Sequence, residues 1–194
     1  MAAPRSLIGL LWAAFVVCWL VLAQFNKKAS RNTPLWGGWG VRVAILVGVL
    51  IVLPFRQHAI AARIVPIGRS LPLRLGITGQ WLGVGLCLVG FGLAVWARLY
   101  LGRNWGMPMS LRQGHELVTS GPYAYVRHPI YTGIMLAMIG SAVTENLLWL
   151  LLFTLYFAYF LVSARTEEKM MLTQFPDAYP PYRRRTKMLI PFLF

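Results

Sequence analysis

Two long runs without a charged residue constrain this chain more than any other feature of its sequence. Leu7 to Phe25 covers 19 residues and Leu75 to Ala97 covers 23. A helix of either length crosses about 30 Å of hydrocarbon. With 58% hydrophobic residues and a mean hydropathy of +0.61, the chain has too little polar sequence to cover a soluble core. We therefore expect an all-α integral membrane protein.

Three further apolar segments bring the expected number of membrane helices to about five. The segments are Trp36 to Phe55, Ile130 to Val143 and Leu147 to Ala164. Since a short polar break separates the last two segments and the first of them is short, they predict a helical hairpin with one stunted arm. Residues 1–194 then form a single membrane domain: 1–101 hold three helices, and 102–194 hold a loop, the hairpin and a tail.

Two local features of the apolar runs bear on this prediction. The sequence VLAQF, which ends the first run, is a poor site for signal-peptide cleavage, so we expect a retained helix. Gly79 and Gly83 in the long run form a small-xxx-small pair, which would let another helix approach closely. The alternative is that these glycines are only tolerated within a membrane helix.

The net charge of +14 is best explained by membrane topology. Five Lys and Arg residues lie on the side of the N-terminus, and the other fourteen of the nineteen lie on the opposite side. The positive-inside rule predicts an external N-terminus and a cytoplasmic loop and tail. We expect the membrane to be a bacterial or archaeal inner membrane. Nothing resembles a nucleic-acid reading module, so we expect basic side chains to meet membrane lipid.

The stretch GPYAYVRHPIYTG, residues 121–133, concentrates special residues between two apolar runs. Pro129 suits the first position of a helix, which would place His128 at the helix N-terminus, where carboxylates and phosphates bind. Tyr123, Tyr125 and Tyr131 offer hydroxyls and ring faces that attract a cation. The alternative is that these residues are interfacial anchors.

A second cluster, RTEEKMM at residues 165–171, follows the last apolar run. Glu167 and Glu168 could hydrogen-bond a ribose diol or an ammonium group, and Arg165 could hold a carboxylate. A solvated helix end with local ion pairs is the alternative. Neither the two cysteines nor the three histidines have metal-ligand spacing, so we expect no metal site.

Together, three pieces resemble the isoprenylcysteine carboxyl methyltransferase family and its phospholipid-methylating relatives. They are HELVTSGPYAYVRHPIYTG at residues 115–133, the acidic pair Glu167 and Glu168, and the tail pattern F…Y..Y…T…IP at residues 175–191. The resemblance covers roughly the last 95 residues, and one departure from it is Pro176, where a glycine is usual. It implies S-adenosylmethionine (SAM) as cofactor and a lipophilic small-molecule or prenylated acceptor.

The resemblance also implies roles for individual residues. Arg165, Glu167 and Glu168 are the implied catalytic group, with Arg165 facing the acceptor and either glutamate holding the polar end of the cofactor. The implied cofactor-binding residues are His115, Glu116, Leu117, Val118, Tyr123, His128, Pro129, Ile130, Tyr131 and Glu167.

The favoured acceptor is the carboxylate of an isoprenylcysteine-like substrate, which is ionised at neutral pH and needs no general base. A phospholipid amine is an alternative acceptor that would need one, and Glu167, Glu168 or His128 could supply it. Two other functions are alternatives: an NADPH-dependent membrane reductase, in which the arginines at 183–185 would hold a phosphate, and a non-enzymatic membrane assembly protein.

Overall fold

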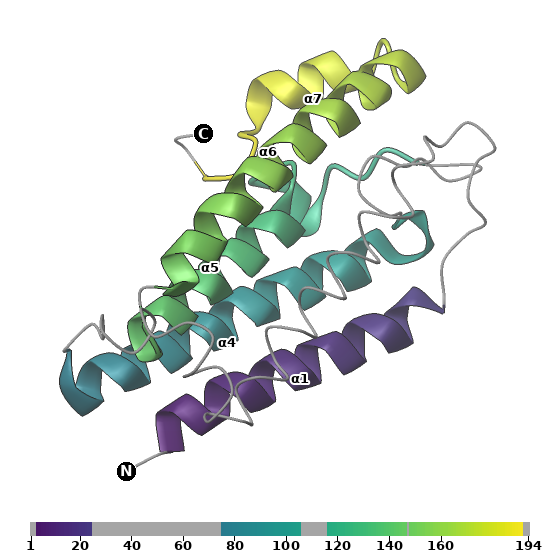
Figure 1. Ribbon diagram of the computed structural model, residues 1–194. Coiled ribbons are helices and arrows are strands. Elements are labelled where there is room, and N and C mark those ends of the chain that lie inside the picture. Colours follow the sequence, from purple (N-terminus) through teal and green to yellow (C-terminus); the bar gives the residue numbers. More distant parts are fainter. Residues whose placement is uncertain (1–2, 25–74, 106–115, 147, 192–194) are drawn as a thin grey trace.

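A computed structural model describes residues 3–24, 75–105, 116–146 and 148–191 (Figure 1). Their main helices are α1 (Ala3–Ala23), α4 (Gly76–Leu101), α5 (Pro129–Thr144), α6 (Leu148–Gln174) and the short α7 (Tyr179–Arg185). Two single-turn 3₁₀ helices, η2 (Gly102–Asn104) and η3 (Gly121–Ala124), lie between α4 and α5. The predicted all-helical membrane fold is confirmed.

The lengths of these helices fit a membrane. Segments of α1 (Pro4–Leu22) and α6 (Trp149–Gln174), together with α4 and η2 (Gly76–Asn104), are long and apolar enough to cross a bilayer, and α5 is a shorter apolar helix. Large apolar side chains on the outer faces of these helices are exposed, as lipid contact requires. They include Leu10, Val17, Trp81, Leu88, Leu151 and Leu155.

The helix directions bring four helix ends together (Figure 1). α1 and α4 run side by side in the same direction, whereas α5 runs back along α4 and α6 runs back along α5. The C-terminal ends of α1, α4 and α6 therefore meet the N-terminal end of α5. Most of the residues singled out from the sequence lie at this end of the bundle.

Glycines allow α4 and α5 to pack backbone against backbone. A Cβ on Gly90 would lie 2.5 Å from the carbonyl oxygen of Gly133, and a Cβ on Gly140 would lie 2.5 Å from that of Gly83. The close approach predicted for Gly83 is therefore found, with α5 as the partner. Gly79 instead meets the side chain of Leu75 in its own turn.

α1 is fixed to this pair by aromatic and polar contacts. Trp12 packs edge-on against Phe91 of α4 at 4.9 Å and donates a hydrogen bond to Ser141 of α5 at 3.0 Å. Arg98 is only 2% exposed and donates hydrogen bonds to Leu22 O at 2.6 Å and to Gly102 O at 2.8 Å. Its guanidinium also lies 4.6 Å from the centroid of the Trp105 ring. Arg98 thus joins the C-terminal ends of α1 and α4.

Four of the predicted membrane helices have counterparts here, while Trp36 to Phe55 lies outside the described residues. The main difference concerns the last helix, which was expected to end at Ala164 but continues to Gln174. The added residues are mostly good helix formers, and the helix ends where Pro176 follows. The glutamate pair consequently lies on α6 itself.

Candidate functional site

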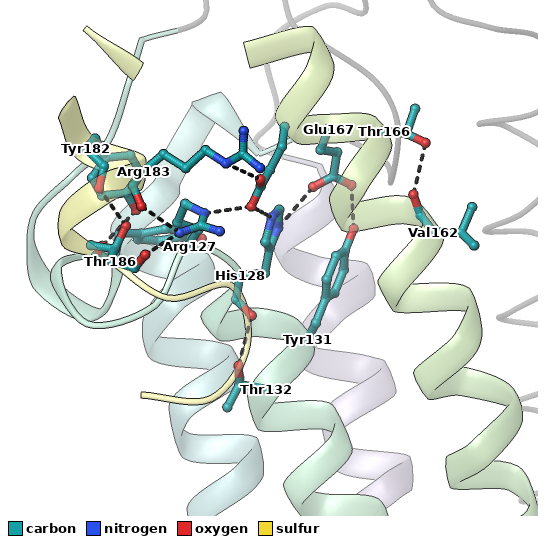
Figure 2. A network of polar contacts seen from close by, with 12 residues as sticks. Arg127, His128, Tyr131, Thr132, Val162, Thr166, Glu167, Tyr182, Arg183 and Thr186 are labelled. Atoms are coloured by element: carbon teal, nitrogen blue, oxygen red, sulfur yellow. Dashed lines mark hydrogen bonds and ion pairs between the residues drawn. The ribbon is translucent and has the colours of Figure 1, made fainter. Parts of the chain in front are cut away.

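The backbone before α5 sets the position of His128. Gly121 has φ of +60°, a conformation suited to glycine, and the Tyr100 ring would lie 2.6 Å from any Cβ at this position. After the η3 turn, Pro129 begins α5 and His128 is its N-cap, as the sequence predicted. His128 therefore projects from the mouth of α5 toward α6 (Figure 2).

Glu167 on α6 meets two side chains from the start of α5 (Figure 2). The Tyr131 hydroxyl donates to Glu167 Oε1 at 2.5 Å, and His128 Nδ1 lies 3.4 Å from Glu167 Oε2. The His128 turn and the acidic pair, nearly forty positions apart in sequence, are thus in direct contact.

Glu168 occupies a different environment from its neighbour. Arg127 Nε donates to Glu168 Oε1 at 2.6 Å, and Arg183 Nε lies 3.1 Å from Glu168 Oε2. His128 Nε2 is 3.7 Å from Glu168 Oε1, which is beyond hydrogen-bonding distance. Glu168 is 3% exposed, and a charge that is so well buried needs compensation. Arginines from two segments of the chain provide it.

The C-terminal tail packs against the backbone around His128. An isolated parallel bridge pairs Val126 with Lys187, and Arg127 and His128 donate backbone hydrogen bonds to the carbonyls of Lys187 (2.8 Å) and Met188 (3.1 Å). The Thr132 hydroxyl donates to Leu189 O at 2.6 Å, and the Leu189 side chain is fully buried. The tail is therefore a structural part of the site.

The electrostatics favour a charged imidazole. Burial alone lowers the pKa of His128, but the contact with Glu167 and the negative charges of Glu167 and Glu168 outweigh it and raise the pKa above its ordinary value of 6.5. Burial raises the pKa of Tyr182 to about 12, so its hydroxyl stays neutral and donates to Tyr123 O at 2.7 Å.

Aromatic rings form the membrane side of the site. The His128 and Tyr131 rings are stacked with centroids 5.4 Å apart, and Tyr131 is stacked on Phe160 at 4.4 Å. Tyr123, Ile130 and Trp105 belong to the same buried cluster. Ring faces beside a partly exposed carboxylate make an environment suited to an organic cation.

The structure brings many of the predicted site residues together. Tyr123, Pro129, Ile130 and Tyr131 are buried around His128, and Val118 packs against their cluster. The remaining predicted residues lie further out. Leu117 is half-buried, Glu116 and Arg165 are exposed, and His115 lies outside the described residues.

Several residues of the network were not selected from the sequence as site residues. Arg127 also donates to the carbonyls of Arg183 (3.1 Å) and Thr186, and the Thr186 hydroxyl donates to Tyr182 O at 2.9 Å. A signal was present, because Tyr182 and Thr186 belong to the tail pattern and Arg127 directly precedes His128. Their contacts with the turn, however, depend on the fold of the tail.

Fold and site together define an all-helical membrane protein with a polar, aromatic-walled site at one end of a helical hairpin. The family model described as phospholipid methyltransferase matches residues 78–178, more than half of the chain. The chain belongs to the phospholipid methyltransferase family.

Individual relatives agree with this assignment. The cobalt-zinc-cadmium resistance protein CzcN of Cupriavidus metallidurans is 37% identical over 119 residues, which cover 60% of this chain and 50% of CzcN. Methanethiol S-methyltransferase 2 of Bradyrhizobium diazoefficiens is 42% identical over 83 residues, 42% of this chain and 31% of that protein. This chain therefore matches half or less of each relative's length.

A solved structure shares the fold. The eukaryotic intramembrane Ras methyltransferase ICMT (isoprenylcysteine carboxyl methyltransferase) superposes with a TM-score of 0.59 and 27% identity, over 76% of this chain and 52% of ICMT. The predicted resemblance to this group of proteins is confirmed.

Proposed function

We propose that this chain is a SAM-dependent methyltransferase that acts within the membrane on a lipophilic acceptor. The contact of His128 and Tyr131 with Glu167, next to the stacked ring of Phe160, is the observation that carries the proposal. Family membership supports the same reaction class.

The residues present fit the chemical groups of SAM. The Glu167 side chain is 23% exposed and can accept hydrogen bonds from an ammonium group or a ribose diol. The rings of Tyr131 and Phe160, which stack on each other beside Glu167, would line the apolar wall next to the sulfonium. His128 Nε2 is buried without a hydrogen-bond partner among the described residues, so a polar ligand atom could satisfy it.

When bound, SAM would supply an activated methyl group on its sulfonium. The protein's task would then be to orient the donor, align the acceptor in line and exclude water. Tyr131 and His128 would hold Glu167 in place. The tail around the buried Leu189 would exclude water from the side of the site that it covers. An ionised carboxylate acceptor needs no general base, and the exposed Arg165 could meet it.

For the acceptor, we propose an isoprenylcysteine-like carboxylate, supported by the fold shared with ICMT. A thiol is the second candidate, because a relative is named methanethiol S-methyltransferase. A thiol or a phospholipid amine would have to lose a proton, and Glu167 with His128 would be the group to receive it. SAM is a cytosolic metabolite, so this end of the bundle would face the cytoplasm.

The experiment is incubation of the purified protein with methyl-labelled SAM and either a synthetic prenylcysteine or a bacterial lipid extract. We expect a labelled product, identified by mass spectrometry as a methyl ester, thioether or methylated amine. Glu167→Gln should lower the rate at least about 10-fold, the cost of losing a charge-assisted hydrogen bond. Glu145→Gln is the matched control, because Glu145 lies at the other end of α5.

Two results would contradict the proposal. Absence of any labelled product, together with binding of NADPH, would favour the reductase. Absence of both would favour a membrane assembly protein.

A further inference from the structure

The two glutamates point in different directions from α6. Successive residues of a helix are rotated by about 100°, so Glu167 and Glu168 face different sides of α6. Of the partners described here they share only His128, which lies 3.4 Å from Glu167 Oε2 and 3.7 Å from Glu168 Oε1. Glu167 faces α5, where it meets His128 and Tyr131. Glu168 faces two arginines, one before α5 and one in the tail.

The partners of Glu168 leave it little capacity for a ligand. One oxygen accepts a hydrogen bond from Arg127 at 2.6 Å, the other forms an ion pair with Arg183 at 3.1 Å, and the side chain is 4% exposed. A ligand at Oε1 would have to break the ion pair with Arg127, whose side chain is only 8% exposed, and loss of a buried ion pair is unfavourable. A ligand at Oε2 would have to displace Arg183. The surroundings of Glu168 are those of a structural residue.

Arg127 extends this ion pair into the tail. The same guanidinium that meets Glu168 donates to the carbonyl oxygens of Arg183 and Thr186, and the Arg127 backbone N–H donates to Lys187 O. We call Arg127, Glu168 and Arg183 the tail anchor. It joins α6, the turn before α5 and the tail, and so fixes the backbone directly before His128.

Glu167 lies in a more exposed environment than Glu168. Its side chain is 23% exposed, against 4% for Glu168, and it contacts the hydroxyl of Tyr131 and the imidazole of His128. Those two rings continue into the aromatic stack with Phe160. The carboxylate of Glu167 therefore lies next to the aromatic stack.

We propose that the adjacent glutamates divide the work of the site: Glu167 contacts the cofactor, and Glu168 is a positioning residue that acts through Arg127 and Arg183. The cofactor half of this inference rests on the proposed function. The tail half rests on the described contacts alone.

The tail half is tested with trypsin, because the tail carries basic residues at 183, 184, 185 and 187. Release of the C-terminal peptide from the detergent-solubilised protein is followed by mass spectrometry. Glu168→Gln and Arg127→Lys should release it at least about 10-fold faster than wild type, whereas Glu167→Gln should release it at the wild-type rate. Lysine in place of Arg127 keeps the charge but cannot reach Glu168 and two carbonyls together.

Milder variants guard against a general loss of folding. Arg183→Gln removes a partner of Glu168 from an exposed position, and Arg184→Gln removes a neighbouring exposed arginine. Each variant also removes one trypsin site, so the two are matched. Arg183→Gln should speed release and Arg184→Gln should not; equal rates for the two would overturn the role of the anchor.

The cofactor half is tested by calorimetric titration with SAM. Glu167→Gln should weaken binding at least about 10-fold while its tail remains protected, and Arg183→Gln should weaken it less than about threefold. Binding by wild type and equally by Glu167→Gln would overturn this half. No binding by wild type would instead overturn the proposed function, and the trypsin result would still decide the role of Glu168.

Discussion

The charge of His128 is the most sensitive property of the site. The imidazole lies between Glu167 and Glu168, and these carboxylates raise its pKa above 6.5 in spite of burial. A group whose pKa is raised by folding stabilises the folded state in its protonated form. This stabilisation is complete below the ordinary pKa and is lost as the pH rises through the raised value.

We therefore expect the melting temperature in detergent to fall as the pH rises above about 6.5, with a slope that His128→Gln reduces. The measurement is a thermal unfolding series of both proteins across this range. Identical pH dependence in the two proteins would show that His128 does not carry the charge. The direction also matters, because a rise in stability with pH would mean that burial, and not the carboxylates, dominates.

Arg98 is the buried cation that joins two helix ends. Its guanidinium reaches Leu22 O and Gly102 O at once, which the single ammonium of a lysine cannot reproduce. Arg98→Lys should lower the free energy of unfolding by about 1.5–3 kcal/mol, the range for hydrogen bonds that involve a charge. The exposed Arg103 supplies the control, since Arg103→Lys should leave the unfolding transition unchanged.

The packing of α4 on α5 depends on which glycines face the other helix. Gly90 meets α5 backbone within 2.5 Å, whereas Gly92 has open space within 4 Å of a Cβ. Gly90→Ala should destabilise the fold by about 1–3 kcal/mol through overpacking. Gly92→Ala should be neutral or slightly stabilising, because alanine is the better helix former. Equal effects of the two changes on thermal unfolding would contradict the backbone contact.

Sequence alone predicted the helices better than their ends. The apolar runs predicted the positions of α1, α4 and α5 closely, because an uncharged run long enough to cross a membrane usually forms a helix. The end of α6 was predicted ten residues early, because hydropathy marks the end of the membrane and not the end of the helix. Glu167 and Glu168 were recognised, but their different partners could not be, since those follow from helix rotation and tail position.

The tail was the least predictable part of the site. Arg127 and Arg183 are 56 positions apart, and no local pattern shows that both meet Glu168. The Val126–Lys187 bridge is likewise a contact between distant segments. Only the spacing of Tyr179, Tyr182 and Thr186 hinted that the tail has a fixed structure, and all three are buried.

The site lies at one of the two ends of the helix bundle, and under the proposed function the orientation in the membrane would decide whether cytosolic SAM can reach it. The charge distribution predicts that the His128 end is cytoplasmic. Thr119→Cys lies at this end and Asn146→Cys at the opposite end of α5. In oriented vesicles a membrane-impermeant maleimide should label Thr119→Cys only from the cytoplasmic side and Asn146→Cys only from the other. The reverse pattern would contradict the predicted topology.

The central claim is that the turn before α5 and the acidic pair of α6 form one cofactor site. Ultraviolet crosslinking of labelled SAM to the purified protein, followed by peptide mapping, tests it most directly. The label should lie in peptides from residues 116–133 or 165–174 and should disappear with excess unlabelled SAM. Label confined to other peptides, or label that excess SAM does not displace, would contradict the account.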